Sequence, residues 1–318
     1  MNTAEVLNTP GYYYAIAYAL SVFVITCTNE RKIGRWKLAA VSCAQFALLL
    51  FFMTETDGVR QELFIPSMMV IVGLLLGYIY ICNDFSLREA GFYLVKAFIN
   101  GEFAASLCWQ LYYYLRYVRG IQGELLKWVE LILVYAVIFT ILALMELNLK
   151  KDLEELHITR RELLVVIIIA ASVFAMSNLS YLDQNGLFSG SFVMDIFIIR
   201  TLVDLSGIAV LYAYHVQVKE IQIRFEKDTL HNIMEMQYKN YQLSKENIDM
   251  VNQKYHDLKH QINLLKTQAY VGKSTSYLEK MEREIRVYET QNKTGNQILD
   301  AVLTNKAMIC HNKEIELK

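Results

Sequence analysis

The sequence of 318 residues contains only two prolines, Pro10 and Pro66. Because proline interrupts helices, this scarcity favours long continuous helices. The five cysteines form neither a CxxC pair nor another metal-ligand spacing, so they are typical of small core residues in reducing surroundings. The first ten residues hold no lysine or arginine, which argues against a cleavable secretory signal. These absences favour an all-α chain without a covalent or metal framework.

Charged residues are sparse up to about residue 215 and dense after it. With 54% hydrophobic residues, the chain is too apolar for a soluble protein with one ordinary core. A spanning helix needs roughly 20 mostly apolar residues, and this criterion predicts about seven spans. They are Gly11–Thr28, Leu38–Met53, Leu63–Cys82, Gly91–Leu115, Trp128–Leu147, Leu163–Ser180 and Phe192–His215. We therefore expect a polytopic transmembrane helix bundle over residues 1–215.

The basic residues predict the orientation of this bundle. They gather after the first span and after the fifth, at Arg31, Lys32, Arg35, Lys37, Lys150, Lys151, Arg160 and Arg161. Loops rich in lysine and arginine face the cytoplasm. The loop at 54–62 is net acidic and residues 178–191 contain no lysine or arginine, which fits the opposite side. We expect a multi-pass protein of the cell membrane with its N-terminus outside and its C-terminus in the cytoplasm.

Five ionisable residues fall inside the predicted spans: Lys96, Glu102, Asp195, Arg200 and Asp204. Such residues are costly in a membrane unless they are paired or face a wet cavity. Arg200 and Asp204 are four residues apart, so an ion pair within one helix is available. The five charges either fix the register of the helices or line a ligand or switch cavity, and the sequence favours neither interpretation.

A charged helix without glycine or proline is predicted from residue 216 to about 269. Apolar or small residues recur along it in steps of three and four, which is typical of a coiled-coil seam. The seam contains Tyr241, Ser244, Ile248, Val251, Tyr255, Leu258, Ile262, Leu265 and Ala269. We expect a signalling linker at 216–249 that joins the last span directly. After a break at 270–276, a second helix at 277–291 would complete a dimerisation hairpin over 250–291, and two chains would form a four-helix bundle.

His256 lies at an outward position of this seam, because Tyr255 and Leu258 occupy inward positions. An exposed imidazole is substantially neutral in the cytoplasm, so a ring nitrogen can attack a phosphoryl group. His260 follows one turn later on the same face. The pair could also bind Zn²⁺, but no suitable third ligand is near in the sequence and we predict no metal site. The residues alone favour an ordinary pair of surface histidines.

Residues 255–262, YHDLKHQI, resemble the phosphoacceptor box of membrane sensor histidine kinases with a GHKL-type ATPase domain. This branch includes the peptide-pheromone receptor kinases of Gram-positive bacteria. Residues 295–303, GNQILDAVL, with Lys306 beyond them, are similar to the entrance of that ATPase domain, which assigns 292–318 to its start. The resemblance implies that His256 is autophosphorylated and that Asp257 assists proton removal. Tyr255 departs from the pattern, because many relatives carry arginine there.

The family binds ATP with Mg²⁺ through an Asn-containing helix and glycine-rich loops. Only Gly272 and Gly295 follow His256 here, and backbone cradling of phosphates needs such loops. We therefore expect a chain truncated before the ATP-binding motifs, in which no cofactor is bound. The resemblance further implies a homodimer, transfer of phosphate to a response-regulator aspartate, and quorum sensing of an extracellular or membrane ligand such as a peptide. It implies no nucleic-acid partner.

Two other functions fit the sequence. The chain could be a phosphoacceptor or receptor scaffold that does not use ATP itself and is served by a separate kinase. It could also be a small-molecule transporter, as the charges in the fourth and seventh spans suggest. These charged spans do not recur between the two halves of the chain, so we rank the transporter last.

Overall fold

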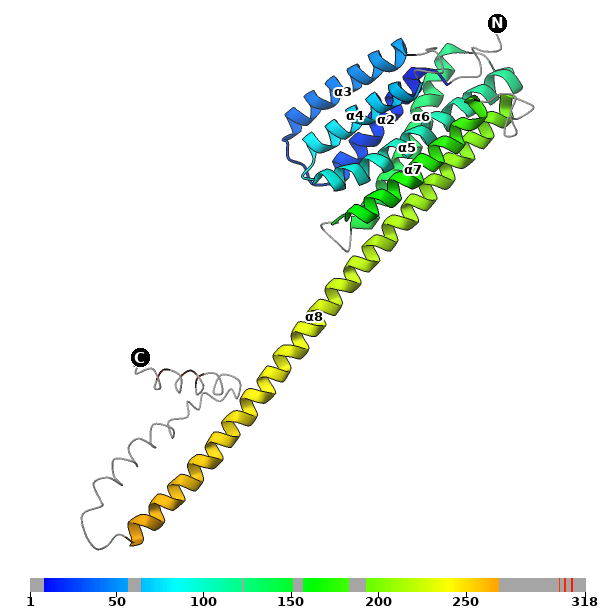
Figure 1. Ribbon diagram of the computed structural model, residues 1–318. Coiled ribbons are helices and arrows are strands. Elements are labelled where there is room, and N and C mark those ends of the chain that lie inside the picture. Colours follow the sequence, from blue (N-terminus) through cyan, green and yellow to red (C-terminus); the bar gives the residue numbers. More distant parts are fainter. Residues whose placement is uncertain are drawn as a thin grey trace. The chain divides into compact units, whose positions relative to one another are not determined.

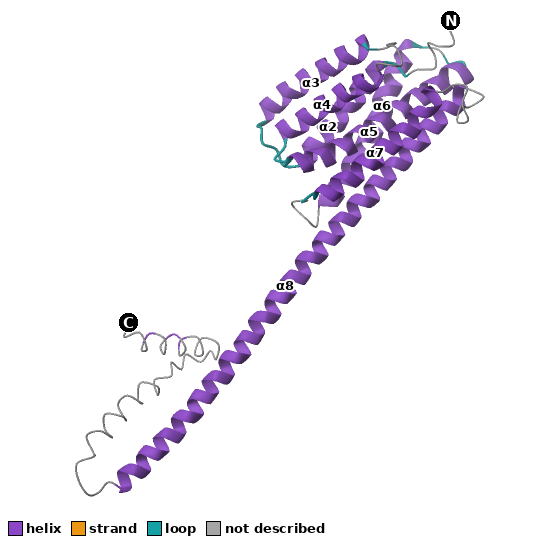
Figure 2. Ribbon diagram, in the orientation of Figure 1, coloured by secondary structure: helices purple, strands orange, loops and turns teal. Residues whose placement is uncertain are grey.

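A computed structural model describes residues 9–56, 64–121, 123–150, 157–182 and 193–268, together with 303, 306 and 310 (Figure 1). Figure 2 shows that these ranges are almost entirely helical. No strand forms within them, and their one β-type contact is an isolated bridge between Arg31 and Asn83. The prediction of an all-α chain is confirmed for this part of the protein.

The helices are α2 (Gly11–Thr28), α3 (Arg35–Glu55), α4 (Phe64–Cys82), α5 (Leu87–Tyr113), α6 (Glu124–Lys150), α7 (Arg160–Leu182) and α8 (Val193–Gln268). A short π-helical turn, η2 (Tyr114–Val118), continues α5. Each predicted span falls on one of these helices. Six of the described helices, all except α5, are long and apolar enough to cross a membrane. The chain thus has the helical architecture of a membrane protein, while the count of seven spans stays a prediction.

Four helices, α3, α5, α6 and α7, begin three or four residues earlier than their apolar runs predict, and two of these starts carry capping boxes. Ser86 and Glu89 form a capping box, in which the Glu89 amide donates to Ser86 Oγ and the Ser86 amide donates to Glu89 Oε2. Thr159 and Glu162 make the same reciprocal pair at the start of α7. Each box stabilises a polar first turn, which a search for apolar runs does not include in the helix. The Ser/Thr-x-x-Glu pattern would have revealed both starts in the sequence.

Helix α5 lies at the centre of the bundle and packs against α2, α4, α6 and α7 (Figure 1). The helices around it expose large apolar side chains, among them Trp36, Phe51, Ile65, Met69, Ile132, Leu133, Leu164 and Ile168. Soluble monomers rarely expose apolar surface this extensive, whereas lipid is its ordinary surroundings. The bundle therefore has an apolar core that also encloses several charged residues, and its outer surface is apolar as well.

Helix α8 runs through the boundary between two compact units, residues 1–223 and 224–318. Its continuity agrees with a linker joined directly to the last span. Beyond residue 223 most described side chains are exposed, and Tyr241, Ser244 and Ile248 of the predicted seam are half-buried. The coiled coil needs a second chain and stays a prediction. The second hairpin helix at 277–291 and most of the segment at 292–318 lie outside the described residues.

Candidate functional site

One face of α8 carries both apolar and ionisable side chains into the bundle. Its buried residues are Ile196, Phe197, Arg200, Thr201, Asp204, Gly207, Ile208, Leu211, His215, Val218 and Lys219. Their spacing of mostly three and four residues places them on a single stripe of the helix. The stripe brings charged groups of α8 into contact with groups from α2, α5, α6 and α7, and these contacts form two clusters.

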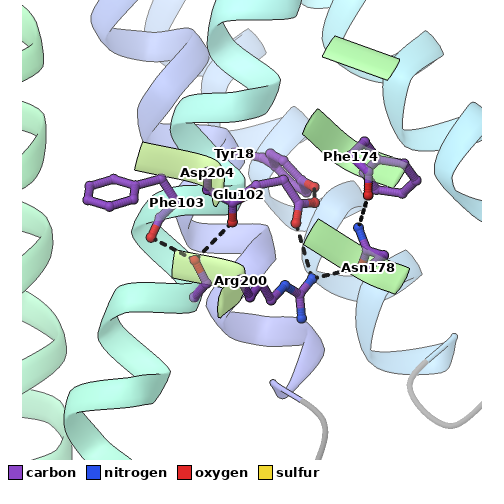
Figure 3. Close-up of polar contacts among 8 residues, drawn as sticks. Tyr18, Glu102, Phe103, Phe174, Asn178, Arg200 and Asp204 are labelled. Carbon is purple, nitrogen blue, oxygen red and sulfur yellow. Dashed lines mark hydrogen bonds and ion pairs between the residues drawn. The ribbon is translucent and has the colours of Figure 1, made fainter. Parts of the chain in front are cut away.

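The first cluster, which we name the central cluster, joins four helices through Glu102 of α5 (Figure 3). One oxygen of Glu102 accepts a hydrogen bond from the Tyr18 hydroxyl of α2, and Oε2 lies 3.2 Å from Arg200 Nη2 of α8. The same Nη2 donates to Asn178 Oδ1 of α7 at 3.1 Å. The guanidinium carbon of Arg200 also lies 5.3 Å from the centre of the Tyr14 ring. Glu102 and Arg200 thus compensate each other's charge within the bundle.

Asp204 completes the central cluster one turn after Arg200. Its carboxylate is fully buried, and Oδ2 accepts a hydrogen bond from Ser106 Oγ of α5 at 3.1 Å. The ion pair that the sequence makes available between Arg200 and Asp204 is not the one adopted. The long Arg200 side chain instead reaches Glu102, which lies across the helix interface. Asp204 feels the charge of Arg200 but forms no ion pair with it among the described residues.

The second cluster, the lysine cluster, consists of Lys96 of α5, Glu146 of α6 and His215 of α8. Lys96 Nζ forms a buried ion pair with Glu146 Oε1 and lies 2.8 Å from His215 Nδ1. An ammonium group can only donate, so Nδ1 accepts and the His215 ring is neutral with its proton on Nε2. The ring of Phe92 meets the imidazole edge-on, with 5.2 Å between centroids. This arrangement fixes both the tautomer and the orientation of His215.

Four of the five predicted intramembrane residues lie in these clusters: Glu102, Arg200 and Asp204 in the first, and Lys96 in the second. Asp195 is half-buried in the first turn of α8, where the helix dipole favours a carboxylate. Sequence reasoning missed Tyr18, Ser106, Glu146, Asn178 and His215. For His215 a signal existed, because it lies eleven residues after Asp204, about three helical turns, and so on the same face.

Gly101 allows α2 to approach α5 next to the central cluster. A Cβ atom at this position would collide with the Tyr18 ring, coming within 2.9 Å of its Cε1 and closer to Cδ1. We expect Gly101→Ala to lower the free energy of unfolding by about 1–3 kcal/mol, because Tyr18 must move away from Glu102. Gly77→Ala on α4 is the matched control, since nothing lies within 4 Å of its Cβ position. Thermal unfolding of both variants in detergent checks this, and equal stability would refute the close packing.

His256, Asp257 and His260 are all exposed on α8. The heptad position predicted this exposure for His256. Nearby seam residues differ in the single chain: Ile262 is 5% exposed, whereas Leu258 and Leu265 are 42% and 51% exposed. The side chain of Tyr255 lies outside the described residues. Apolar side chains left in water on a charged helix favour a partner helix.

Within the described ranges, no three His, Cys, Asp or Glu side chains converge on a position that could hold a metal ion. Comparisons of the chain with protein-family models, with curated proteins and with solved structures found no match.

Proposed function

We propose that the chain is the sensor and phosphoacceptor part of a sensor histidine kinase of the cell membrane. His256 receives the phosphoryl group, and a cytoplasmic response regulator takes it onto an aspartate. The observation that carries the proposal is α8 itself. This one helix bears Arg200, Asp204 and His215 inside the bundle and the exposed His256 beyond it.

The two clusters give α8 a means of responding to a signal. Buried charge pairs have a few discrete arrangements, because an intermediate position leaves a charge without its partner. A ligand on the outer side or within the spans, such as a peptide, acts by preferring one arrangement. A change in the contacts of Arg200 or His215 rotates α8 or shifts it along its axis. In a homodimer the seam of α8 would then pair differently and alter access to His256.

The chemistry at His256 needs little from its surroundings. Phosphoryl transfer depends mainly on in-line positioning and on stabilisation of charge, and an exposed ring on a helix is open to an incoming donor. Asp257 is adjacent in sequence, and adjacent helical side chains point about 100° apart. Asp257 therefore assists through its electrostatic field and does not hydrogen-bond to the His256 ring.

ATP with Mg²⁺ supplies the phosphoryl group in the family that the motif resembles. The residues present do not fit this cofactor. Only Gly272 and Gly295 follow His256, and the described ranges hold no acidic cluster suited to a metal ion. We assign no ATP site to this chain.

The test is labelling with ATP of membranes that contain the protein, expressed with any sequence that follows Lys318 in its gene. We expect acid-labile phosphate on the wild type, none on His256→Gln, and an undiminished label on His260→Gln. His260 is the matched control because it is an exposed histidine one turn away on the same helix. Persistence of the label in His256→Gln would overturn the assignment. A label that depends on an added kinase would favour the receptor-scaffold function.

A further inference from the structure

The central cluster contains more negative than positive charge. Glu102 and Asp204 are carboxylates, and Arg200 is the one basic group bonded within the cluster. Arg200 bonds to Glu102 through Nη2, and its Nε has no hydrogen-bond partner among the described residues. With both carboxyl groups ionised, the cluster would carry a net charge of −1. An unpaired carboxylate inside a membrane protein is costly. The central cluster therefore holds one carboxyl group more than it holds basic groups, and Arg200 alone cannot balance both.

Three oxygen atoms around Asp204 have unused hydrogen-bonding capacity. Asp204 Oδ1, Ser177 Oγ and Thr201 Oγ1 have no hydrogen-bond partner within the part of the chain that the structure describes. The three residues are only 0%, 2% and 7% exposed, respectively. The Ser177 side chain of α7 lies within reach of a hydrogen bond to the Asp204 carboxyl group, and Thr201 precedes Asp204 by about one turn on the same stripe. Buried polar atoms normally have partners, so unpartnered oxygens on neighbouring helices next to a buried carboxyl group point to a ligand.

We propose that Asp204, Ser106, Ser177 and Thr201 form a binding site for one sodium ion between α5, α7 and α8. Carboxylate and hydroxyl oxygens suit hard cations. The single uncompensated charge matches a monovalent ion, whereas a calcium site usually gathers several carboxylates. Short side chains let helices approach closely, which favours the smaller Na⁺ over K⁺. A proton on Asp204 would complete one hydrogen bond, whereas an ion can be shared by several oxygens.

Bound sodium would hold α8 to α5 and α7 at the level of Arg200. An ion that binds only the folded bundle stabilises it by mass action, so its presence can be read from unfolding without any assay of activity. This site is independent of phosphorylation at His256, and its failure would leave the kinase proposal untouched.

The experiment measures thermal unfolding of the purified chain in detergent at constant ionic strength, with NaCl, KCl or N-methylglucamine chloride. We expect saturating NaCl to raise the Tm by about 5 °C over the other two salts. Asp204→Asn should unfold at one temperature in all three salts. Equal stabilisation by K⁺ and Na⁺, or a Tm that follows pH but not sodium, would overturn the proposal.

A second pair of variants keeps the test decisive if Asp204→Asn does not fold. Ser177→Ala should shift the NaCl concentration of half-maximal stabilisation about tenfold upward, because it removes one oxygen ligand. Ser206→Ala is the matched control, since Ser206 is an exposed serine of α8 whose hydroxyl bonds to the carbonyl oxygen of Val203. A wild-type sodium midpoint in Ser177→Ala would exclude Ser177 from the site.

Discussion

Replacing Arg200 with methionine is expected to lower the free energy of unfolding of the bundle by about 3 kcal/mol. Methionine keeps much of the length and apolar character of the side chain but removes the charge. Glu102 then retains only the Tyr18 hydroxyl, and two buried carboxylates remain in the central cluster with no basic group bonded to them. Unfolding in mixed micelles, followed by loss of helical circular dichroism, measures the change.

Two controls separate the charge from other effects of this substitution. Arg224→Met makes the same replacement at an exposed position of α8 and should change stability by no more than about 0.5 kcal/mol. The double variant Glu102→Gln with Arg200→Met should recover most of the loss, because neither buried partner is then charged. If Arg200→Met were as stable as Arg224→Met, the Glu102–Arg200 pair would not be acting as a desolvated ion pair.

Much of the fold is predictable because each apolar run must become a helix in a membrane. Residues 11–28 form the first predicted span and also α2, with the same ends. The starts of α3, α5, α6 and α7 were predicted three or four residues late, because their first turns contain charged residues. Local patterns therefore gave the positions of the helices, and capping boxes account for the earlier starts of α5 and α7.

The partners of the buried charges were not predictable in the same way. Glu102 and Arg200 are 98 residues apart, and so are Ser106 and Asp204. A single sequence contains no signal that chooses between a partner four residues away on the same helix and one on another helix. That choice depends on which faces of α5, α7 and α8 meet. The sequence could state that charges inside spans must be paired, but not which pairs form.

The phosphoacceptor segment differs from the buried charges, because the exposure of its histidine was predictable from the sequence. The heptad pattern alone predicts that His256 is exposed, and it is. Its proposed role rests on the resemblance of residues 255–262 to a motif and on the continuity of α8 with the bundle. The exposed Leu258 and Leu265 favour pairing of this segment with a second helix.

Lys96→Met is expected to destabilise the bundle by about 3 kcal/mol as well. The substitution takes the shared donor away from two groups at once, since Lys96 pairs with Glu146 and donates to His215 Nδ1. Glu146 would remain as a charge that is only 8% exposed. His215 would lose the contact that fixes its tautomer, which nitrogen NMR of labelled histidine can detect alongside the unfolding measurement.

The matched control for this variant is Lys32→Met. Lys32 also pairs with a carboxylate, Asp84 at 3.4 Å, but both side chains are largely in contact with solvent. Exposed ion pairs contribute about 0–1 kcal/mol, so the control should be nearly as stable as the wild type. Combining Lys96→Met with Glu146→Gln should restore stability but leave the His215 tautomer unfixed. Recovery of both properties in the double variant would show that the contact with Lys96 does not fix the tautomer of His215.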